Sequence, residues 1–160
     1  MPLTHVLLWL FVLNLGIAFG AGLYEARISV ARWLGPPQGP RPGWHPEEAL
    51  RDDPGRRFWG FTTTLPLTLL TLANLWAAWH APPPLRRWWL IAALAALADR
   101  GGTFLYFIPR MIRLLRTADS PGARADMRQW ARLNYLRISL MLVAWLTALQ
   151  ALSLLKGQPG

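Results

Sequence analysis

Two adjacent charged residues, Asp99 and Arg100, lie inside the apolar stretch of residues 88–108. A charge at such depth in an apolar helix costs several kcal/mol unless it is paired or hydrated, so it marks a candidate functional site. Two structural explanations stay open beside it. Asp99 and Arg100 form satisfied ion pairs that hold the bundle together, or Gly101 and Gly102 end the apolar stretch early and leave both charges near its boundary.

Helical spacing gathers further polar and aromatic side chains around this pair, because residues three, four and seven apart share a helix face. One stripe holds Arg100, Phe104, Phe107 and Met111, its neighbour holds Asp99, Thr103, Tyr106 and Arg110, and a later stripe holds Trp130, Asn134, Arg137 and Met141. As antiparallel neighbours, residues 106–111 and 130–137 would lie opposite each other, with Pro109 adding a kink. The spacing therefore predicts a cationic and aromatic pocket.

The chemistry expected there is stabilisation of an organic anion. Guanidinium groups stabilise a phenolate or enolate, an amide and a phenol orient it, and aromatic rings stack on it. We assign Arg100, Asn134 and Arg137 to catalysis, and Asp99, Tyr106, Phe107 and Trp130 to substrate binding.

The elements that position these residues are predicted to be membrane-spanning helices. Hydrophobic residues make up 53% of the chain and fall into four blocks, each near the roughly 20 residues that cross a bilayer. The predicted spans are residues 5–23, 58–79, 88–108 and 138–155. We expect one all-α domain over residues 1–160, an integral membrane four-helix bundle with a long loop at 24–57.

The basic residues predict the orientation. Thirteen of them flank the spans on the side opposite the N-terminus, against three on the N-terminal side. This positive-inside bias places the Arg-rich loops in the cytoplasm and both termini outside, in a bacterial-type inner or plasma membrane. The third and fourth helices should extend past the bilayer as a cytoplasmic hairpin, with Ser120 and Pro121 starting the last helix.

Smaller features predict how the helices pack. Gly16 and Gly20 form a G-x-x-x-G pair that lets another helix approach, and Asn14 and Asn74 are placed to bond across helices. Glu25 is placed to neutralise Arg100 or Arg137. Six of the ten tryptophans lie near predicted span ends as interfacial anchors, namely Trp59, Trp76, Trp79, Trp88, Trp89 and Trp130.

Several other functional classes are excluded or disfavoured. The chain has no cysteine, so disulfides and thiolate chemistry are absent. His5, His45 and His80 form no metal-binding pattern, although His5 and His80 belong to the same predicted side. We expect no metal and no cofactor. The net charge of +9 comes from arginines beside apolar blocks, which favours membrane lipids over nucleic acid as partner.

The segment Thr103 to Pro109, followed by W-x-x-L-N-x-x-R at residues 130–137, resembles the DUF1772 family of four-helix membrane proteins. That family includes anthrone oxygenases, which oxidise tricyclic aromatic polyketide intermediates without an evident metal or flavin. The resemblance covers about residues 99–137 and points to Tyr106, Phe107, Pro109, Trp130, Asn134 and Arg137. It implies a fold, and it brings no established catalytic assignment.

Two functions follow from the sequence. The first is a cofactor-independent, oxygenase-like enzyme (an oxidoreductase) acting on a lipophilic aromatic small molecule. The alternative is a non-enzymatic accessory, lipid-binding or assembly subunit of a membrane complex, in which the polar cluster only joins helices. Whether the chain forms a homo-oligomer or has a membrane-complex partner stays open, as do the substrate and any role of His5 and His80.

Overall fold

The computed structural model describes residues 3–35 and 43–156, and it is entirely helical in this part of the chain. In chain order, with η for π-helical segments, the elements are α1 Leu3–Tyr24, η1 Glu25–Ser29, α2 Val30–Trp33, α3 Pro46–Asp52, η2 Gly55–Thr64, α4 Leu65–His80, α5 Leu85–Gly102, η3 Thr103–Phe107, α6 Ile108–Leu115 and α7 Pro121–Lys156. The predicted all-α class is confirmed.

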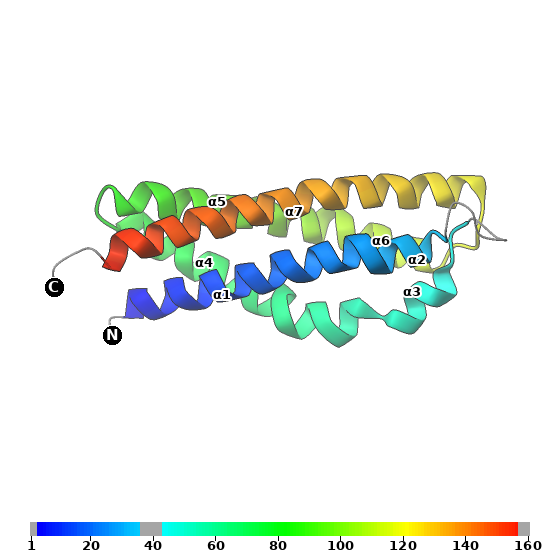
Figure 1. Cartoon of the computed structure of the whole chain (residues 1–160), viewed down its shortest axis with the longest axis horizontal. Helices are drawn as coiled ribbons and strands as arrows, with labels where there is room; N and C mark the ends of the chain where they lie inside the picture. The colour runs from blue at the N-terminus through cyan, green and yellow to red at the C-terminus, as the bar shows by residue number, and fades with distance from the viewer. Residues whose placement is uncertain (1–2, 36–42, 157–160) are drawn as a thin grey trace.

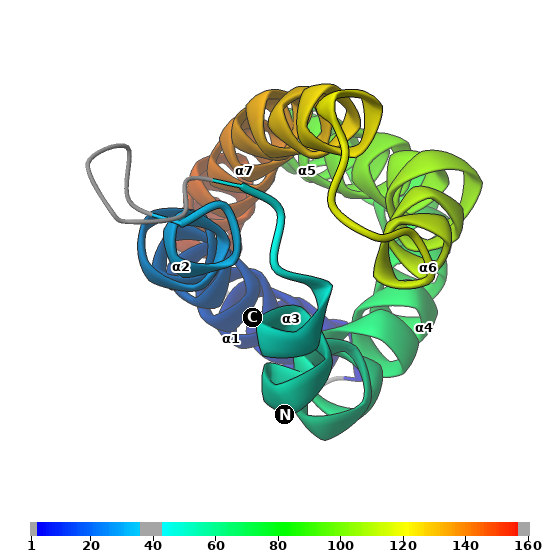
Figure 2. The same cartoon turned by 90° about the vertical axis from the view of Figure 1, so that its right-hand side faces the viewer.

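Four long helical rods run side by side along the molecule, and α3 is a fifth, short helix (Figure 1). The first rod joins α1, η1 and α2; the second joins η2 and α4; the third joins α5, η3 and α6; and the fourth is α7. Both termini lie at one end, which we call the termini end. The opposite end, called the turn end, carries α2, α3 and the α6–α7 turn (Figure 2).

Three of these helices are long and apolar enough to cross a membrane: Leu3–Trp33, Leu85–Leu115 and Pro121–Leu155. The predicted span at 58–79 is not among them, so the structure supports three of the four predicted spans. That segment is helical but divided, because ten residues of π-helix precede an α4 of only 16 residues. Polar residues also dilute it, including Thr62, Thr63, Thr64 and Asn74.

The helices extend beyond the predicted spans wherever the apolar run ends before the helix ends. The first rod continues past Leu23 to Trp33, and α3 together with the start of η2 fills most of the second half of the predicted loop 24–57. Charged residues such as Glu25 and Arg27 continue a helix well, although they mark the end of an apolar run. Gly35, with a φ of 65°, ends the first rod in the left-handed region that favours glycine. The proline-rich stretch 36–42 lies outside the described residues.

The hairpin of the last two rods is confirmed as an extended structure. The third rod ends at Leu115, and α7 then runs for 36 residues, about 54 Å at 1.5 Å per residue. Ser120 caps α7, because its Oγ accepts a hydrogen bond from the backbone N–H of Ala123 at 3.1 Å.

Prolines help explain where two π segments end. Pro66 and Pro109 both lie in the first turn of the α-helix that follows η2 or η3. Proline has no N–H and its ring crowds the carbonyl four residues earlier, which for Pro66 is that of Thr62. Asn14 supplies the missing donor, since its Nδ2 donates to the Thr62 carbonyl at 2.8 Å. The predicted bond across helices from Asn14 is thereby confirmed; no proline adjoins η1.

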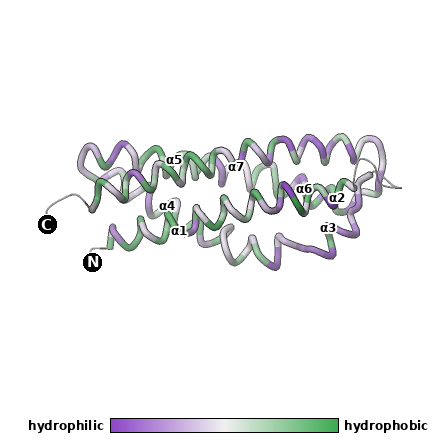
Figure 3. The backbone as a smooth tube through the Cα atoms, in the orientation of Figure 1, coloured by the Kyte–Doolittle hydropathy of each residue, from purple (hydrophilic) through white to green (hydrophobic). Residues whose placement is uncertain are grey.

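Two separate hydrophobic cores divide the bundle along its length. The core at the termini end is built largely of leucine and alanine from α1, α4, α5 and α7, around Phe11 and Trp89. The core at the turn end is smaller and rich in aromatic residues, with Trp33, Trp44, Phe107 and Trp130. Hydrophilic residues are concentrated toward this second end (Figure 3).

The packing at the termini end agrees with the prediction for Asn74 and only partly with that for the glycine pair. Asn74 is fully buried; its Nδ2 donates to the carbonyl of Leu7 at 3.3 Å and its Oδ1 accepts from Trp89 Nε1 at 2.9 Å. A Cβ on Gly16 would come within 3.1 Å of the Trp145 indole, whereas one on Gly20 would meet nothing within 4 Å. The G-x-x-x-G pair therefore admits a neighbour at one glycine only.

Burial corrects part of the tryptophan prediction. Trp76 and Trp79 are exposed near the end of α4, as expected for anchors. Trp89 and Trp130 are buried in the two cores, so the anchor prediction was wrong for these two. Both indole N–H groups have partners inside the protein, which removes the reason for placing them at a water interface.

Candidate functional site

Between the two cores lies a cluster of buried charged and polar side chains, to which all three π segments contribute. Glu25 comes from η1, Trp59 from η2, and Tyr106 and Phe107 from η3. Arg137 completes it from α7. π-helical turns are rare and occur often at functional sites. Their convergence on one level of the bundle is a feature that sequence reasoning missed, because the sequence shows only the two prolines.

Arg137 lies at the centre of this cluster. Its guanidinium is 3.8 Å from a carboxylate oxygen of Glu25, and Glu25 also accepts a hydrogen bond from Trp59 Nε1 at 2.8 Å. The guanidinium carbon lies 4.9 Å from the ring centre of Phe107 and 5.7 Å from that of Trp59. The predicted pairing of Glu25 with Arg137 is confirmed, and two aromatic rings hold the cation in place.

Asp99 and Arg100 form a second buried ion pair. Arg100 Nε donates to Asp99 Oδ2 at 2.9 Å, and its Nη2 donates to the same oxygen. Both side chains are almost completely buried. The Arg100 guanidinium is therefore paired with the carboxylate of the preceding residue, Asp99. With Glu25 and Arg137 the cluster holds two carboxylates and two guanidinium groups, so its formal charges cancel.

Several buried polar atoms around these pairs have no hydrogen-bond partner among the described residues. They are Asp99 Oδ1, Thr103 Oγ1, Tyr106 Oη and both amide atoms of Asn134. Buried polar groups in proteins are almost always satisfied, and each exception costs about 1–3 kcal/mol. Five such atoms lie within a few helical turns of one another, so their hydrogen-bonding capacity is not used within the described part of the chain.

A partly open pocket of about 200 Å³ adjoins the cluster between α5–η3 and α7. Four of the seven predicted site residues line it, namely Asp99, Tyr106, Phe107 and Arg137, together with Ala98, Gly102, Leu133, Leu136 and Leu140. The walls are thus largely apolar, and the polar groups are few. A second hollow of about 560 Å³ between α1 and α4 is lined by apolar residues and Asn14, and it contains none of the predicted site residues.

The other predicted site residues lie beside the pocket. Trp130 donates its indole N–H to the Phe107 carbonyl at 3.2 Å and packs edge-on against the Phe107 ring, so it positions a pocket wall. Asn134 lies on α7 one helical turn from Arg137 and is fully buried. Arg100 neutralises Asp99. The structure thus brings all seven residues to one region of the bundle and divides them into lining and supporting groups.

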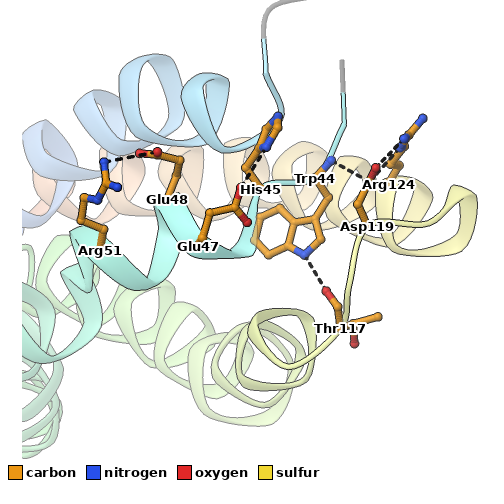
Figure 4. A network of polar contacts seen from close by, with 8 residues as sticks. All are labelled: Trp44, His45, Glu47, Glu48, Arg51, Thr117, Asp119 and Arg124. Carbon is orange, nitrogen blue, oxygen red and sulfur yellow. Dashed lines mark hydrogen bonds and ion pairs between the residues drawn. The ribbon is translucent and has the colours of Figure 1, made fainter. Parts of the chain in front are cut away.

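The turn end of the bundle is closed by a segment that sequence reasoning treated as a loop. Trp44 is buried beside the α6–α7 turn, where its indole nitrogen lies 3.2 Å from the carbonyl oxygen of Leu114 and 3.2 Å from that of Thr117. Figure 4 shows the contact with Thr117. The Trp44 backbone N–H donates to Asp119 Oδ1 at 2.9 Å, and Arg124 pairs with the same carboxylate. The hydrogen bond from Arg124 is the main cause that holds the pKa of Asp119 well below its usual range.

No metal site appears in the described part of the chain, where no three His, Cys, Asp or Glu side chains come together. His80 Nδ1 lies 2.8 Å from the carbonyl of Trp76, and its ring packs against that indole. His5 Nδ1 is buried without a partner among the described residues.

Comparisons with known proteins add no relative. No family model, no curated protein and no solved structure matches the chain. The resemblance to DUF1772 stays a prediction.

Proposed function

We propose that the chain is an integral membrane protein that binds a lipophilic aromatic molecule with an ionisable hydroxyl group in the pocket beside Arg137. The three apolar helices support membrane insertion. The second rod would be a fourth span, since α4 packs with α1 and α5 and turns Leu65, Leu69, Leu72 and Trp76 outward. Both termini would then lie outside, with the turn end in the cytoplasm.

The observation that carries this proposal is the composition of the pocket. Apolar walls from Leu133, Leu136 and Leu140 suit an aromatic ring, while Arg137 and Tyr106 offer donors and Asp99 Oδ1 offers a free acceptor. Binding pockets typically combine apolar surface with a few convergent polar groups. Exposed Ala98 and Leu136 at the pocket rim would admit a ligand sideways from the bilayer.

The same residues suit a reaction that begins with ionisation. Asp99 Oδ1 would accept the proton of an acidic hydroxyl or activated C–H group, and Arg137 would stabilise the anion that forms. Electron-rich anthrone-type anions react directly with dioxygen, which would make the protein a cofactor-independent oxygenase, as the resemblance to DUF1772 also implies. Arg100 would hold the Asp99 carboxylate in place through its hydrogen bonds, and Trp130 would position Phe107.

A specific observation favours the alternative of a non-enzymatic accessory, lipid-binding or assembly subunit. The four buried charges compensate one another in pairs, which is what a purely structural polar junction between helices requires. In that case the unpartnered atoms would be satisfied by water and the pocket would bind no aromatic ligand.

The two functions differ in what happens when the Arg137 charge is removed. In nanodiscs, native mass spectrometry with 2-naphthol as probe would detect binding, and dioxygen consumption with anthrone would detect turnover. Because Arg137→Gln alone leaves Glu25 buried without its partner, the informative variant is Glu25→Gln/Arg137→Gln, with Glu25→Gln as its control. We expect the double variant to fold, by far-UV circular dichroism, and to lose binding and turnover.

Retention of 2-naphthol by the folded double variant, at the wild-type level, would remove the proposed role of Arg137. Binding by the wild type without dioxygen consumption above that of empty nanodiscs would reduce the function to ligand binding and exclude the oxygenase.

A further inference from the structure

The outward face of the third rod stays apolar farther toward the turn end than the outward face of α7, which becomes basic earlier. Exposed apolar residues follow one another at helical spacing along this rod: Leu94, Leu97, Phe104, Leu105, Ile108 and Ile112. Leu105 is 85% exposed and Ile112 is 48% exposed, so neither side chain is covered by the protein. The face ends only at Arg113 and Arg116.

The outward face of α7 changes character much closer to the membrane-spanning part. Leu136, Val143 and Leu146 are exposed and apolar, but Arg132 and Arg128 follow toward the turn end and are exposed. Neither arginine has a partner among the described residues. The apolar belt of the bundle is thus uneven: it reaches farther on the third rod than on α7.

Two contacts fix the relative heights of the rods. Trp130 bonds to the carbonyl of Phe107, and Arg110 pairs with Asp126 at 2.6 Å. Because the rods are antiparallel, Arg128 is about two residues beyond the Phe107 level, whereas Ile112 is five residues beyond it, roughly 7 Å along the axis. An apolar residue therefore lies farther from the bilayer centre than an unpaired arginine.

We propose that the face formed by Leu105, Ile108 and Ile112 is embedded in the inner leaflet of an anionic phospholipid bilayer, with Arg113 and Arg116 at the phosphates, and that the bundle is tilted accordingly. The proposal rests on the membrane insertion put forward above. The occupant is lipid because the face continues the lipid-facing stripe of α5 without interruption. Cationic side chains follow where the apolar stripe stops, which is the arrangement of an interfacial amphipathic helix.

The tilt has a consequence for the pocket. Its rim residues Ala98, Gly102 and Leu136 lie on the bilayer side of the embedded face. The pocket would then open into hydrocarbon and not into headgroups, and a ligand would reach Arg137 without crossing water.

The absence of cysteine from the chain makes the test direct, since each introduced cysteine carries the only label. Nitroxide-labelled Ile112→Cys, Arg128→Cys and Leu146→Cys variants would be reconstituted in phosphatidylcholine vesicles containing phosphatidylglycerol. Accessibility to dioxygen, which concentrates in lipid, and to a water-soluble nickel chelate would be measured by electron paramagnetic resonance.

We expect the label at residue 112 to resemble that at 146, with several-fold lower accessibility to nickel than the label at 128. A label at 112 as accessible to nickel as that at 128, with 146 shielded, would overturn the embedded face and leave membrane insertion intact. If 146 were also exposed to nickel, insertion itself and the function proposed above would fail.

Discussion

Asn74 and Asn134 are both fully buried, yet their surroundings at the termini end and in the polar cluster differ. Asn74, at the termini end, donates to backbone carbonyls and accepts from Trp89. Asn134, in the polar cluster, has no partner for either amide atom among the described residues. The termini end satisfies Asn74 and packs alanine against leucine, while the cluster leaves Asn134 unsatisfied beside a pocket. The difference separates residues that build the fold from residues available to a ligand.

Replacing each asparagine by leucine is expected to separate the two sites with the largest effect on stability. Asn74→Leu should lower the free energy of unfolding by about 2 kcal/mol, because it removes a bond between helices and leaves the Trp89 N–H buried without an acceptor. Asn134→Leu should be neutral or stabilising, since no bond within the chain is lost. Unfolding in mixed micelles, followed by circular dichroism, would compare them. Equal destabilisation would show that Asn134 has a structural partner.

A smaller effect is expected from the glycines of α1. Gly16→Leu should cost about 1 kcal/mol, because its Cβ would press on the Trp145 indole, whereas Gly20→Leu has open space and should cost almost nothing. The same unfolding assay measures both variants, and both gain similar helix propensity. If Gly20→Leu were the more damaging change, Gly20 would be in contact with a second copy or a partner helix.

The smallest effect concerns the contact that closes the turn end. Asp119 has a depressed pKa, so its stabilising contribution is complete above the ordinary aspartate pKa of about 3.9 and is lost as the pH falls from there toward the lower folded value. Hydrogen exchange of the Trp44 amide, corrected for intrinsic rates, should therefore accelerate below about pH 4. Asp119→Asn should show faster exchange already at neutral pH, and an unchanged rate there would separate Trp44 from this carboxylate.

Much of the fold could be read from the sequence because hydropathy and capping are local. The helix start at Ser120 and the bonds made by Asn14 and Asn74 followed from residue type and position. The π segments could not be predicted, because they arise where prolines and packing against other helices displace backbone bonds. The burial of Trp44 could not be predicted for a similar reason, because it depends on contacts with the α6–α7 turn, which is distant in sequence.

The sequence predicted which residues belong to the candidate site better than it predicted how they pair. Helical spacing brought Asp99, Tyr106, Phe107 and Arg137 to one pocket, where the structure also places them. It assigned Arg100 to an anion, whereas the structure pairs Arg100 with Asp99. Adjacent residues do not face each other on a helix, so spacing alone gave no reason to expect that pair.

We propose that the pocket beside Arg137 holds a lipophilic aromatic ligand, and the glycine pair at the end of α5 offers a matched test of this binding. Gly102 lines the pocket and Gly101 does not, and a Cβ at Gly101 meets nothing within 4 Å. Native mass spectrometry of Gly102→Leu and Gly101→Leu in nanodiscs with 2-naphthol isolates the effect of filling the pocket. We predict that Gly102→Leu loses the bound probe and that Gly101→Leu retains it. Equal retention by both folded variants would show that the probe does not bind in the pocket beside Arg137.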